Sequence, residues 1–592
     1  MNILDLNGKW QLKYRIQSLP GDNWEEVDAE VPGNVELDLM RHGIIPDLTK
    51  GDNIYAALEF EQYEWLYLKT FRVPAGFDSD RAVLVFDGID CIASIKLNGH
   101  EIGQASNMFI EHRFDVADAL IPDGENLLEV RIRSAVQEGR KHELSPETFA
   151  FNWESLYIRK AGHMYGWDIA PRIVSAGLWR GVRLEAEAAT RFRSVYLGTA
   201  STDAANRTAT ILLDWDIVTD TYGRDLMFTV TIGKSGTVVH SSQIPLPGTH
   251  GRQYIDLDDV EFWWPRGYGE PHLYDITLQV ADEAGNILAK HCEKLGVRTV
   301  KLNRTEITSE RHDGDFSFIV NGQKIFVKGT NWVPLDALHS RDRRHLEKTF
   351  AMAIDLNCNM LRCWGGNVYE DHAFFELCDT HGILVWQDFA LACACYPQDE
   401  EFIGQIRHEA ESVVKKLRNH PSLVLWSGNN ENDQAYTEWT PLKRDPNACD
   451  KISRQVLAEV VGKLDPLRNY LPSSPYYSPE LMANGLAHDM RPEDHLWGPR
   501  DDFKGPFYMS SNAHFVSEIG YHGCPELESM REMLDADKLW PWQENDQWLT
   551  KAVRSFPAQT NYNYRIPLMA SQIEVLFDKE DVVKNGVEAI RT

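Results

Sequence analysis

Two glutamates each stand at the end of a short apolar run. Glu431 follows the run at 423–426 through Ser427-Gly428-Asn429-Asn430, and Glu518 follows the run that begins at His514. The first run reads as a strand buried on both faces, as in a parallel sheet. In a barrel of parallel strands and outer helices, the ends of such strands carry the catalytic groups. Two carboxylates placed in this way predict acid/base or nucleophilic chemistry on a glycosidic bond.

A lone glutamate is more often a solvated loop residue or an ion-pair partner than a catalytic group. Here other polar and aromatic residues fall at predicted strand ends and would converge on the same mouth. An arginine near one Glu keeps it ionised as a nucleophile, while the other Glu donates a proton to the leaving oxygen. Arg362 alone could be a structural ion-pair residue and Trp364 alone a core residue. The residues in question are Asn331, Trp332, Arg362, Trp364, Asp388, Asn430 and Trp497.

Strand-like and helix-like segments alternate from residue 301 onward, which predicts a parallel sheet. A (β/α)8 TIM barrel is the favoured closure. A doubly wound sheet is the alternative, weakened because no glycine-rich phosphate loop follows an early strand. No eighth strand is found after the seventh, so the barrel looks incomplete at its C-terminus. The predicted strands are 324–329, 358–364, 383–387, 423–426, 469–472, 495–497 and 515–517, and the predicted helices are 343–355, 370–381, 401–419, 447–463 and 570–590.

The first 300 residues have the short alternating runs and frequent turn signals of β structure. Residues 1–190 predict a two-sheet jelly-roll sandwich, and 191–300 predict an immunoglobulin-like sandwich. Residues 301–592 form the predicted catalytic barrel domain. Within the first unit, the aromatic-rich stretch 163–172 contains Trp167 and Asp168. Sugars present CH faces to aromatic rings and hydroxyls to carboxylates, so this stretch could bind sugar. The alternative is a tryptophan packed under the sandwich, with Asp168 capping a turn.

Composition excludes several classes of partner. The 592 residues are 43% hydrophobic and 25% charged, as in globular proteins with several domains. A formal net charge of −29 argues against nucleic acid and anionic membranes as partners. The N-terminus lacks the pattern of a signal peptide, and the most apolar run, 382–397, is too short and polar to span a bilayer. We therefore expect a cytoplasmic protein.

The nine cysteines are scattered, mostly in apolar contexts, which suits reduced buried thiols. The one close pair, Cys393 and Cys395, has no second pair or histidine cluster nearby. A core or pocket-wall role is favoured over a metal site, so no metal is predicted.

Several stretches resemble glycoside hydrolase family 2, and within it the β-mannosidase branch. The resemblance covers nearly the whole chain, and the last two stretches carry most of its specificity. The stretches are VPGNVELDL at 31–39, GIIPD at 43–47, FDGID at 86–90, LNG at 97–99, GLWR at 177–180, WPRGYG at 264–269, KGTNWVP at 328–334, LRCWGG at 361–366, WSGNNE at 426–431 and FVSEIG at 515–520.

The resemblance implies a retaining mechanism with no metal or organic cofactor. It implies that Glu431 is the general acid/base and Glu518 the nucleophile. Asn430 would bind the 2-hydroxyl of the sugar, and Arg362 would lie under the nucleophile. Trp364 would line the −1 subsite, and Trp167 and Asp168 would hold sugar hydroxyls from the N-terminal sandwich. The other predicted substrate-binding residues are Trp332 and Trp497.

The chain departs from the family pattern in three places. The family's Trp-Asp-Trp-Gly-Pro loop is Trp167-Asp168-Ile169-Ala170-Pro171 here. Leu496 replaces a tyrosine that would help to hold the nucleophile, and Tyr508 is a candidate substitute. Relatives continue beyond residue 592 through an eighth barrel strand, so an open barrel edge is expected.

The leading hypothesis is an exo-acting β-mannosidase-like hydrolase that removes terminal β-mannosyl residues from oligosaccharides or glycans. The first alternative is the same chemistry on a β-galactoside, β-glucuronide or β-glucosaminide. The second is a truncated, non-catalytic carbohydrate-binding protein. The open edge leaves room for a homo-oligomer or a complementing C-terminal chain as partner.

Overall fold

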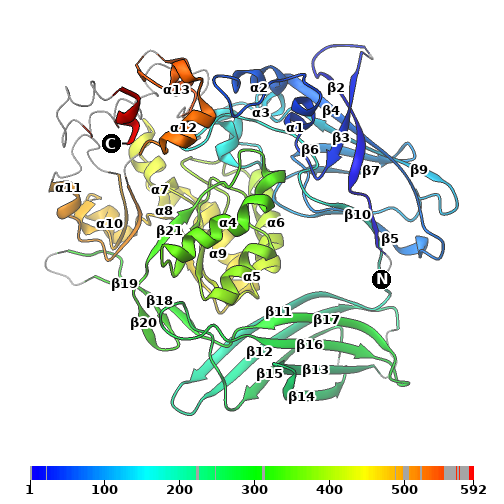
Figure 1. The fold of residues 1–592 in the computed structure, drawn as a ribbon. Helices are drawn as coiled ribbons and strands as arrows, with labels where there is room; N and C mark the ends of the chain where they lie inside the picture. Colours follow the sequence, from blue (N-terminus) through cyan, green and yellow to red (C-terminus); the bar gives the residue numbers. More distant parts are fainter. Residues whose placement is uncertain are drawn as a thin grey trace.

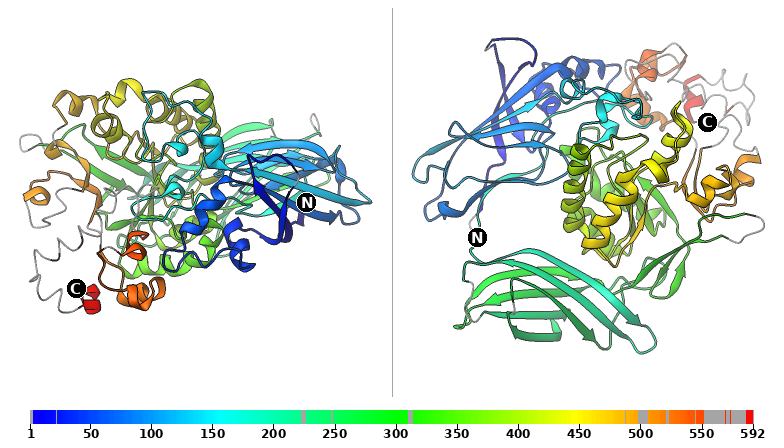
Figure 2. Two further views of the ribbon diagram at one scale, coloured as in Figure 1. Left: turned by 90° about the horizontal axis from the view of Figure 1, so that it is seen from above. Right: turned by 180° about the vertical axis from the view of Figure 1, so that it is seen from behind.

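The computed structural model shows two β-sandwiches and an α/β body (Figure 1). Figure 2 shows from two further sides that the α/β body lies beside both sandwiches. None of the described helices is long and apolar enough to cross a membrane. The structure describes residues 3–21, 23–221, 226–246, 248–309, 314–486, 488–497, 506–520, 523–543, 545–551, 569, 573 and 586–591.

The N-terminal sandwich packs a six-stranded sheet, in the order β3-β2-β4-β9-β6-β7, against a four-stranded sheet, β1-β10-β5-β8. Buried and exposed residues alternate along its strands, so each sheet has one apolar face. Asn98 and Gly99, both with positive φ, form the tight turn between β6 and β7. The strands are β1 (Ile3–Asp5), β2 (Gly8–Ile16), β3 (Glu25–Val31), β4 (Tyr63–Arg72), β5 (Ala82–Phe86), β6 (Ile92–Leu97), β7 (His100–Ser106), β8 (His112–Asp115), β9 (Glu125–Arg133) and β10 (Val182–Ala186), with helices α1 (Val35–Arg41), α2 (Tyr55–Glu59) and α3 (Ala135–Gly139).

The second sandwich pairs the sheet β11-β12-β15 with the sheet β14-β13-β16-β17. Its core is a separate apolar cluster that includes Ile211, Phe228 and Leu278. A three-stranded antiparallel sheet, β18-β19-β20, then leads into the α/β body. The strands are β11 (Arg191–Asp203), β12 (Thr208–Val218), β13 (Met227–Lys234), β14 (Thr237–Pro245), β15 (His250–Leu257), β16 (Tyr274–Ala281), β17 (Ile287–Leu295), β18 (Val300–Arg304), β19 (Phe316–Val320) and β20 (Gln323–Ile325).

The α/β body contains parallel strands with helices outside them, as predicted for a TIM barrel. Five strands form the sheet β21-β22-β23-β24-β25, and β26 pairs with β27. Strands β22, β23, β24 and β26 are buried throughout, because helices cover one face and the barrel interior the other. The strands are β21 (Gly329–Trp332), β22 (Met360–Cys363), β23 (Leu384–Asp388), β24 (Leu423–Ser427), β25 (Asn469–Leu471), β26 (Glu493–Leu496) and β27 (Phe515–Ile519).

The helices of this body follow the strands in chain order. Asp371 caps α5 and Asp399 caps α6, each accepting a backbone N–H in the first turn. They are α4 (Asp342–Asp355), α5 (His372–His381), α6 (Glu400–Leu417), α7 (Asn432–Gln434), α8 (Pro446–Cys449), α9 (Leu457–Leu464), α10 (Pro479–Ala483), α11 (Pro506–Met509), α12 (Leu527–Met533) and α13 (Asp546–Leu549).

Two predicted elements differ from the structure. The first parallel strand is β21, not 324–329, because 323–325 pair antiparallel with β19 and Phe326 is exposed. The helix predicted at 447–463 is divided, because Asp450 lies outside the helical region of backbone space. A π-helical turn, Ile452–Val456, then precedes α9. The helix predicted at 570–590 lies largely outside the described residues.

No eighth parallel strand follows β27 within the part of the chain that the structure describes, which leaves out 552–568 and most of 570–585. The first and seventh strands meet through a side chain instead. Asn331 Nδ2 donates to the carbonyl oxygen of Ser517 at 3.0 Å. This contact brings the C-terminal ends of β21 and β27 to the same mouth.

A buried ion pair joins the N-terminal sandwich to the barrel. Arg159 donates two hydrogen bonds of 2.8 Å to Glu409 on α6, and both side chains are almost fully buried. Asn107 and Tyr369 donate to the same carboxylate at 2.7 and 2.9 Å. The pair therefore fixes the segment that precedes Trp167 against the barrel.

We expect Glu409→Ala to lower the free energy of unfolding by about 3–5 kcal/mol, because the buried Arg159 charge loses its counterion. Chemical denaturation measures the change. The matched control is Glu411→Ala on the same helix, which should change stability by less than about 0.5 kcal/mol. Equal effects of the two substitutions would contradict a structural role for the pair.

Candidate active site

A cavity of about 1130 Å³ lies at the C-terminal ends of the parallel strands. Both glutamates, Asn430, Trp364 and Trp497 line it from the barrel side. Trp167 and Asp168 line it from the loop of the N-terminal sandwich. Residues that are more than 300 positions apart in the chain therefore share one cavity, and its wall combines carboxylates with aromatic rings.

Glu518 is surrounded by hydrogen-bond donors. Arg362 Nη1 lies 2.6 Å from its Oε1, and Trp497 Nε1 donates to Oε2 at 2.8 Å. Burial opposes the charge, but the charges of His495 and Arg362 and the Trp497 hydrogen bond outweigh it, so the pKa of Glu518 is lowered. The side chain is therefore held as a carboxylate, the form in which it can act as a nucleophile.

Arg362 lies behind the cavity wall and is 4% exposed. Its guanidinium also donates to Asn331, Asp388 and Asn430 at 2.9, 2.8 and 2.8 Å. Burial is the main reason that the pKa of Asp388 is raised, to about 6, and the Arg362 charge acts against it. One cation thus fixes four side chains from four strand ends, which gives Arg362 a positioning role.

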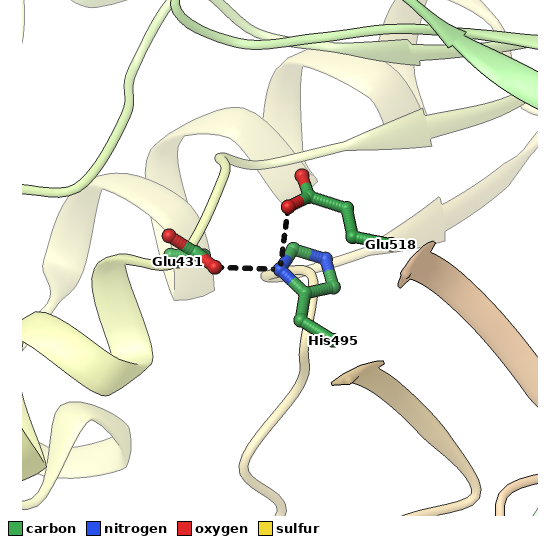
Figure 3. A group of neighbouring side chains, drawn as sticks. All are labelled: Glu431, His495 and Glu518. Atoms are coloured by element: carbon green, nitrogen blue, oxygen red, sulfur yellow. Dashed lines mark hydrogen bonds and ion pairs between the residues drawn. The ribbon is translucent and has the colours of Figure 1, made fainter. Parts of the chain in front are cut away.

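His495 lies between the two glutamates (Figure 3). Its Nδ1 is 2.8 Å from Glu431 Oε1 and 3.4 Å from Glu518 Oε2. One potential metal-ligand atom from each of the three residues lies within 4.8 Å of the other two. Among the described residues, this is the one group of potential metal ligands that lies so close together. They could hold a divalent cation, but one Nδ1–H shared by two carboxylates accounts for the geometry.

The surroundings of His495 assign a proton to both of its nitrogens. Ser474 Oγ donates to Glu493 Oε1 at 2.7 Å, so at 3.1 Å it accepts from His495 Nε2. Burial lowers the pKa of His495, but the negative charge of Glu518 and the hydrogen bond to Glu431 outweigh burial and raise it. A buried imidazolium therefore faces both carboxylates.

Sequence reasoning assigned no role to His495, which belongs to the predicted sixth strand. Its one signal was its place two residues before Trp497, on a predicted strand end. Glu518 contacts His495 and Trp497, where the family pattern suggested a tyrosine after His495. Leu496 is buried at 3% exposure, and Tyr508 is not among the residues that line the cavity.

The remaining predicted residues divide between cavity and core. Trp167 packs edge-on against Trp364, with 5.1 Å between ring centroids, so the sandwich loop and the barrel form one aromatic corner. Ile169, where the family pattern has an aromatic, is 48% exposed and also lines the cavity. Trp332 is not brought to the cavity. It is buried, donates to Glu370 at 2.8 Å and packs on Phe374, so it supports the barrel.

Family models match three successive parts of the chain. Residues 10–180 match the glycosyl hydrolase 2 galactose-binding domain-like model. Residues 200–298 match the model for glycosyl hydrolases family 2, and 314–556 match the TIM barrel domain of that family.

A curated relative, beta-mannosidase B from Emericella nidulans, is 30% identical over 561 residues, which are 90% of this chain and 64% of that protein. The chain thus spans 64% of the length of this relative. A solved structure, a beta-D-mannosidase from Dictyoglomus thermophilum, is 33% identical with a TM-score of 0.83, and the match covers 96% of this chain and 68% of that one.

Bacteroides uniformis beta-glucuronidase 2 is 17% identical with a TM-score of 0.61, over 84% of this chain and 55% of that one, and shares the fold. Three observations agree on the family: the matches to its three models, the arrangement of two sandwiches and a barrel, and the 33% identity to a solved member. The chain belongs to glycoside hydrolase family 2.

Proposed function

We propose that the protein is a retaining, exo-acting β-mannosidase, with Glu518 as nucleophile and Glu431 as general acid/base. The spacing of the two carboxylates carries the proposal. Oxygen atoms of Glu431 and Glu518 lie within 4.8 Å of each other. Retaining glycosidases have carboxylates about 5–5.5 Å apart, whereas inverting enzymes need about 6.5–9.5 Å to admit a water molecule.

The reaction proceeds in two displacements. Glu518 attacks the anomeric carbon, while Glu431 protonates the glycosidic oxygen and the leaving sugar departs. Water then attacks the glycosyl–Glu518 ester, and Glu431 takes its proton, which frees the product with its configuration retained. Arg362, His495 and Trp497 stabilise the Glu518 carboxylate as it is released.

The cavity lining supports a sugar substrate. Trp167 and Trp364 offer aromatic faces to CH groups, and Asp168 and Asn430 offer hydrogen bonds to hydroxyls. Mannose is favoured over other sugars by the likeness to the two β-mannosidases. The proposed substrate is the terminal β-mannosyl residue of an oligosaccharide or glycan, and the proposed location is the cytoplasm.

Hydrolysis of a chromogenic β-mannoside by the purified chain tests the proposal, beside β-galactoside, β-glucuronide and β-glucosaminide analogues. We expect turnover of the mannoside and loss of that turnover in Glu518→Gln. Preference for another glycoside would overturn the sugar assignment. No turnover by a folded chain would overturn the enzymatic function and favour a carbohydrate-binding protein.

The two glutamates should respond differently to substitution. Glu431→Ala should lower kcat/KM on β-mannobiose by roughly 10²–10⁴-fold, the usual contribution of a general acid. The loss should be much smaller on a dinitrophenyl β-mannoside, whose leaving group needs no proton. Azide should restore turnover to Glu431→Ala as β-mannosyl azide and should not do so for Glu518→Gln. α-Mannosyl azide from Glu431→Ala, or β-mannosyl azide from the Glu518 variant, would reverse the two roles.

The acidic limb of the pH profile should depend on His495. The lowered pKa of Glu518 rests in part on the imidazolium, so loss of that charge raises it and leaves less carboxylate at a given pH. In His495→Gln, the acidic limb of kcat/KM should therefore move to higher pH. His514→Gln, which removes a histidine outside this cluster, is the control. An unmoved limb in His495→Gln would contradict an imidazolium at this position.

A further inference from the structure

Both oxygens of Glu431 are occupied by protein groups from different elements. Oε1 accepts from His495 on β26, and Oε2 lies 3.1 Å from the sulfur of Cys393, in the segment after β23. Cys393 is 4% exposed and lines the same cavity as Glu431. The two contacts lie on opposite ends of the carboxyl group, so together they restrict its rotation.

The backbone around Cys393 is built to bring the thiol to this place. Cys393 and Glu431 both lie in the left-handed region, with φ of 51° and 58°. Such a conformation costs of order 1 kcal/mol or more for a residue other than glycine, and it persists where surrounding structure fixes it. Here the two strained residues are the proposed acid/base itself and the cysteine that contacts it. Strain of this kind is typical of functional sites.

Hydrogen bonds between the two segments fix this geometry. The amide of Cys393 donates to the carbonyl of Asn430 at 2.8 Å, and the amide of Asn430 donates to Leu391 at 2.9 Å. The amide of Ala394 donates to Asn432 Oδ1 at 3.2 Å. The segment 391–394 therefore runs in register beside 430–432, and the thiol position follows from the backbone.

The thiol also has an assigned direction. Asn430 Nδ2 lies 3.4 Å from Cys393 Sγ. An amide nitrogen can only donate a hydrogen bond, so the sulfur is the acceptor here. The S–H proton is then available to Glu431 Oε2. Asn430, through its Oδ1, accepts from Arg362. A chain of contacts thus runs from Arg362 through Asn430 and Cys393 to the proposed acid/base.

We propose that Cys393 is a positioning residue for Glu431, whose thiol donates a weak hydrogen bond that orients the carboxyl group while it cycles between acid and base. The inference rests on the proposed function of Glu431. A thiol is a weak donor, so it orients the group and favours the ionised form only slightly. A hydroxyl at the same place would be a stronger donor and would favour the carboxylate.

Substitutions at Cys393 should therefore move the alkaline limb of the kcat/KM profile in opposite directions. Cys393→Ala removes a donor to the carboxylate, so the acid keeps its proton to higher pH. Cys393→Ser supplies a stronger donor, so the limb moves to lower pH. On β-mannobiose, Cys393→Ala should lose roughly three- to tenfold in kcat/KM, the equivalent of one neutral hydrogen bond. The loss on a dinitrophenyl β-mannoside should be smaller.

Cys395→Ala is the matched control. Cys395 is buried two residues further along and packs against Ala435 and Tyr436. Its substitution should leave the alkaline limb in place, since the structure, over the residues it describes, shows no hydrogen bond between Cys395 and Glu431. The inference would be overturned if the alkaline limb moved equally in Cys393→Ala and Cys395→Ala. It would also be overturned if Cys393→Ala and Cys393→Ser moved the limb in the same direction.

A measurement without turnover separates this inference from the proposed function. The infrared S–H stretching band that disappears in Cys393→Ala belongs to this thiol. It should lie at lower frequency in the unsubstituted protein than in Glu431→Ala, where the acceptor is absent. An unchanged band would overturn the inference even in an active enzyme, and a shifted band would uphold the hydrogen bond even if no glycoside is hydrolysed.

Discussion

Two buried cations facing a set of carboxylates are the interaction on which the site depends. Arg362 and His495 are nearly excluded from solvent, and burial alone would disfavour their charges. Their charges are retained because Glu518, Asp388 and Glu431 surround them. The same interaction keeps Glu518, the proposed nucleophile, ionised and holds the carboxyl group of Glu431 close to it. The positions of these side chains and the ionised state of Glu518 therefore have the same cause, which is the charge of Arg362 and His495.

The architecture around this cluster determines which side chains reach it. Parallel strands bring Asn331, Arg362, Asp388 and Glu431 to one mouth, although helices separate them in the chain. The N-terminal sandwich adds Trp167 and Asp168, and the buried Arg159–Glu409 pair fixes that loop to the barrel. The sandwich thus contributes side chains directly to the candidate active site.

The fold class and most of the cavity could be predicted from the sequence, because apolar strands and the polar residues after them leave a local pattern. Glu431, Glu518 and Asn430 are such residues. His495 and Cys393 could not be given roles, since their partners lie on other strands and only register brings them together. Trp332 shares the pattern of a strand-end aromatic, yet its ring turns toward helix α5 and Glu370. A position at a strand end thus predicts that a residue lies near the mouth of the barrel. The direction of its side chain depends on tertiary contacts, which the local sequence does not show.

The most direct test of the central claim is to trap the glycosyl intermediate. The protein is incubated with 2-deoxy-2-fluoro-β-mannosyl fluoride, which slows both displacements but carries a good leaving group. Peptide mass spectrometry then locates the label. The account predicts one fluoromannosyl ester per chain, on Glu518, and none after Glu518→Gln. A label on Glu431 or on another residue, or inactivation without any covalent label, would contradict it.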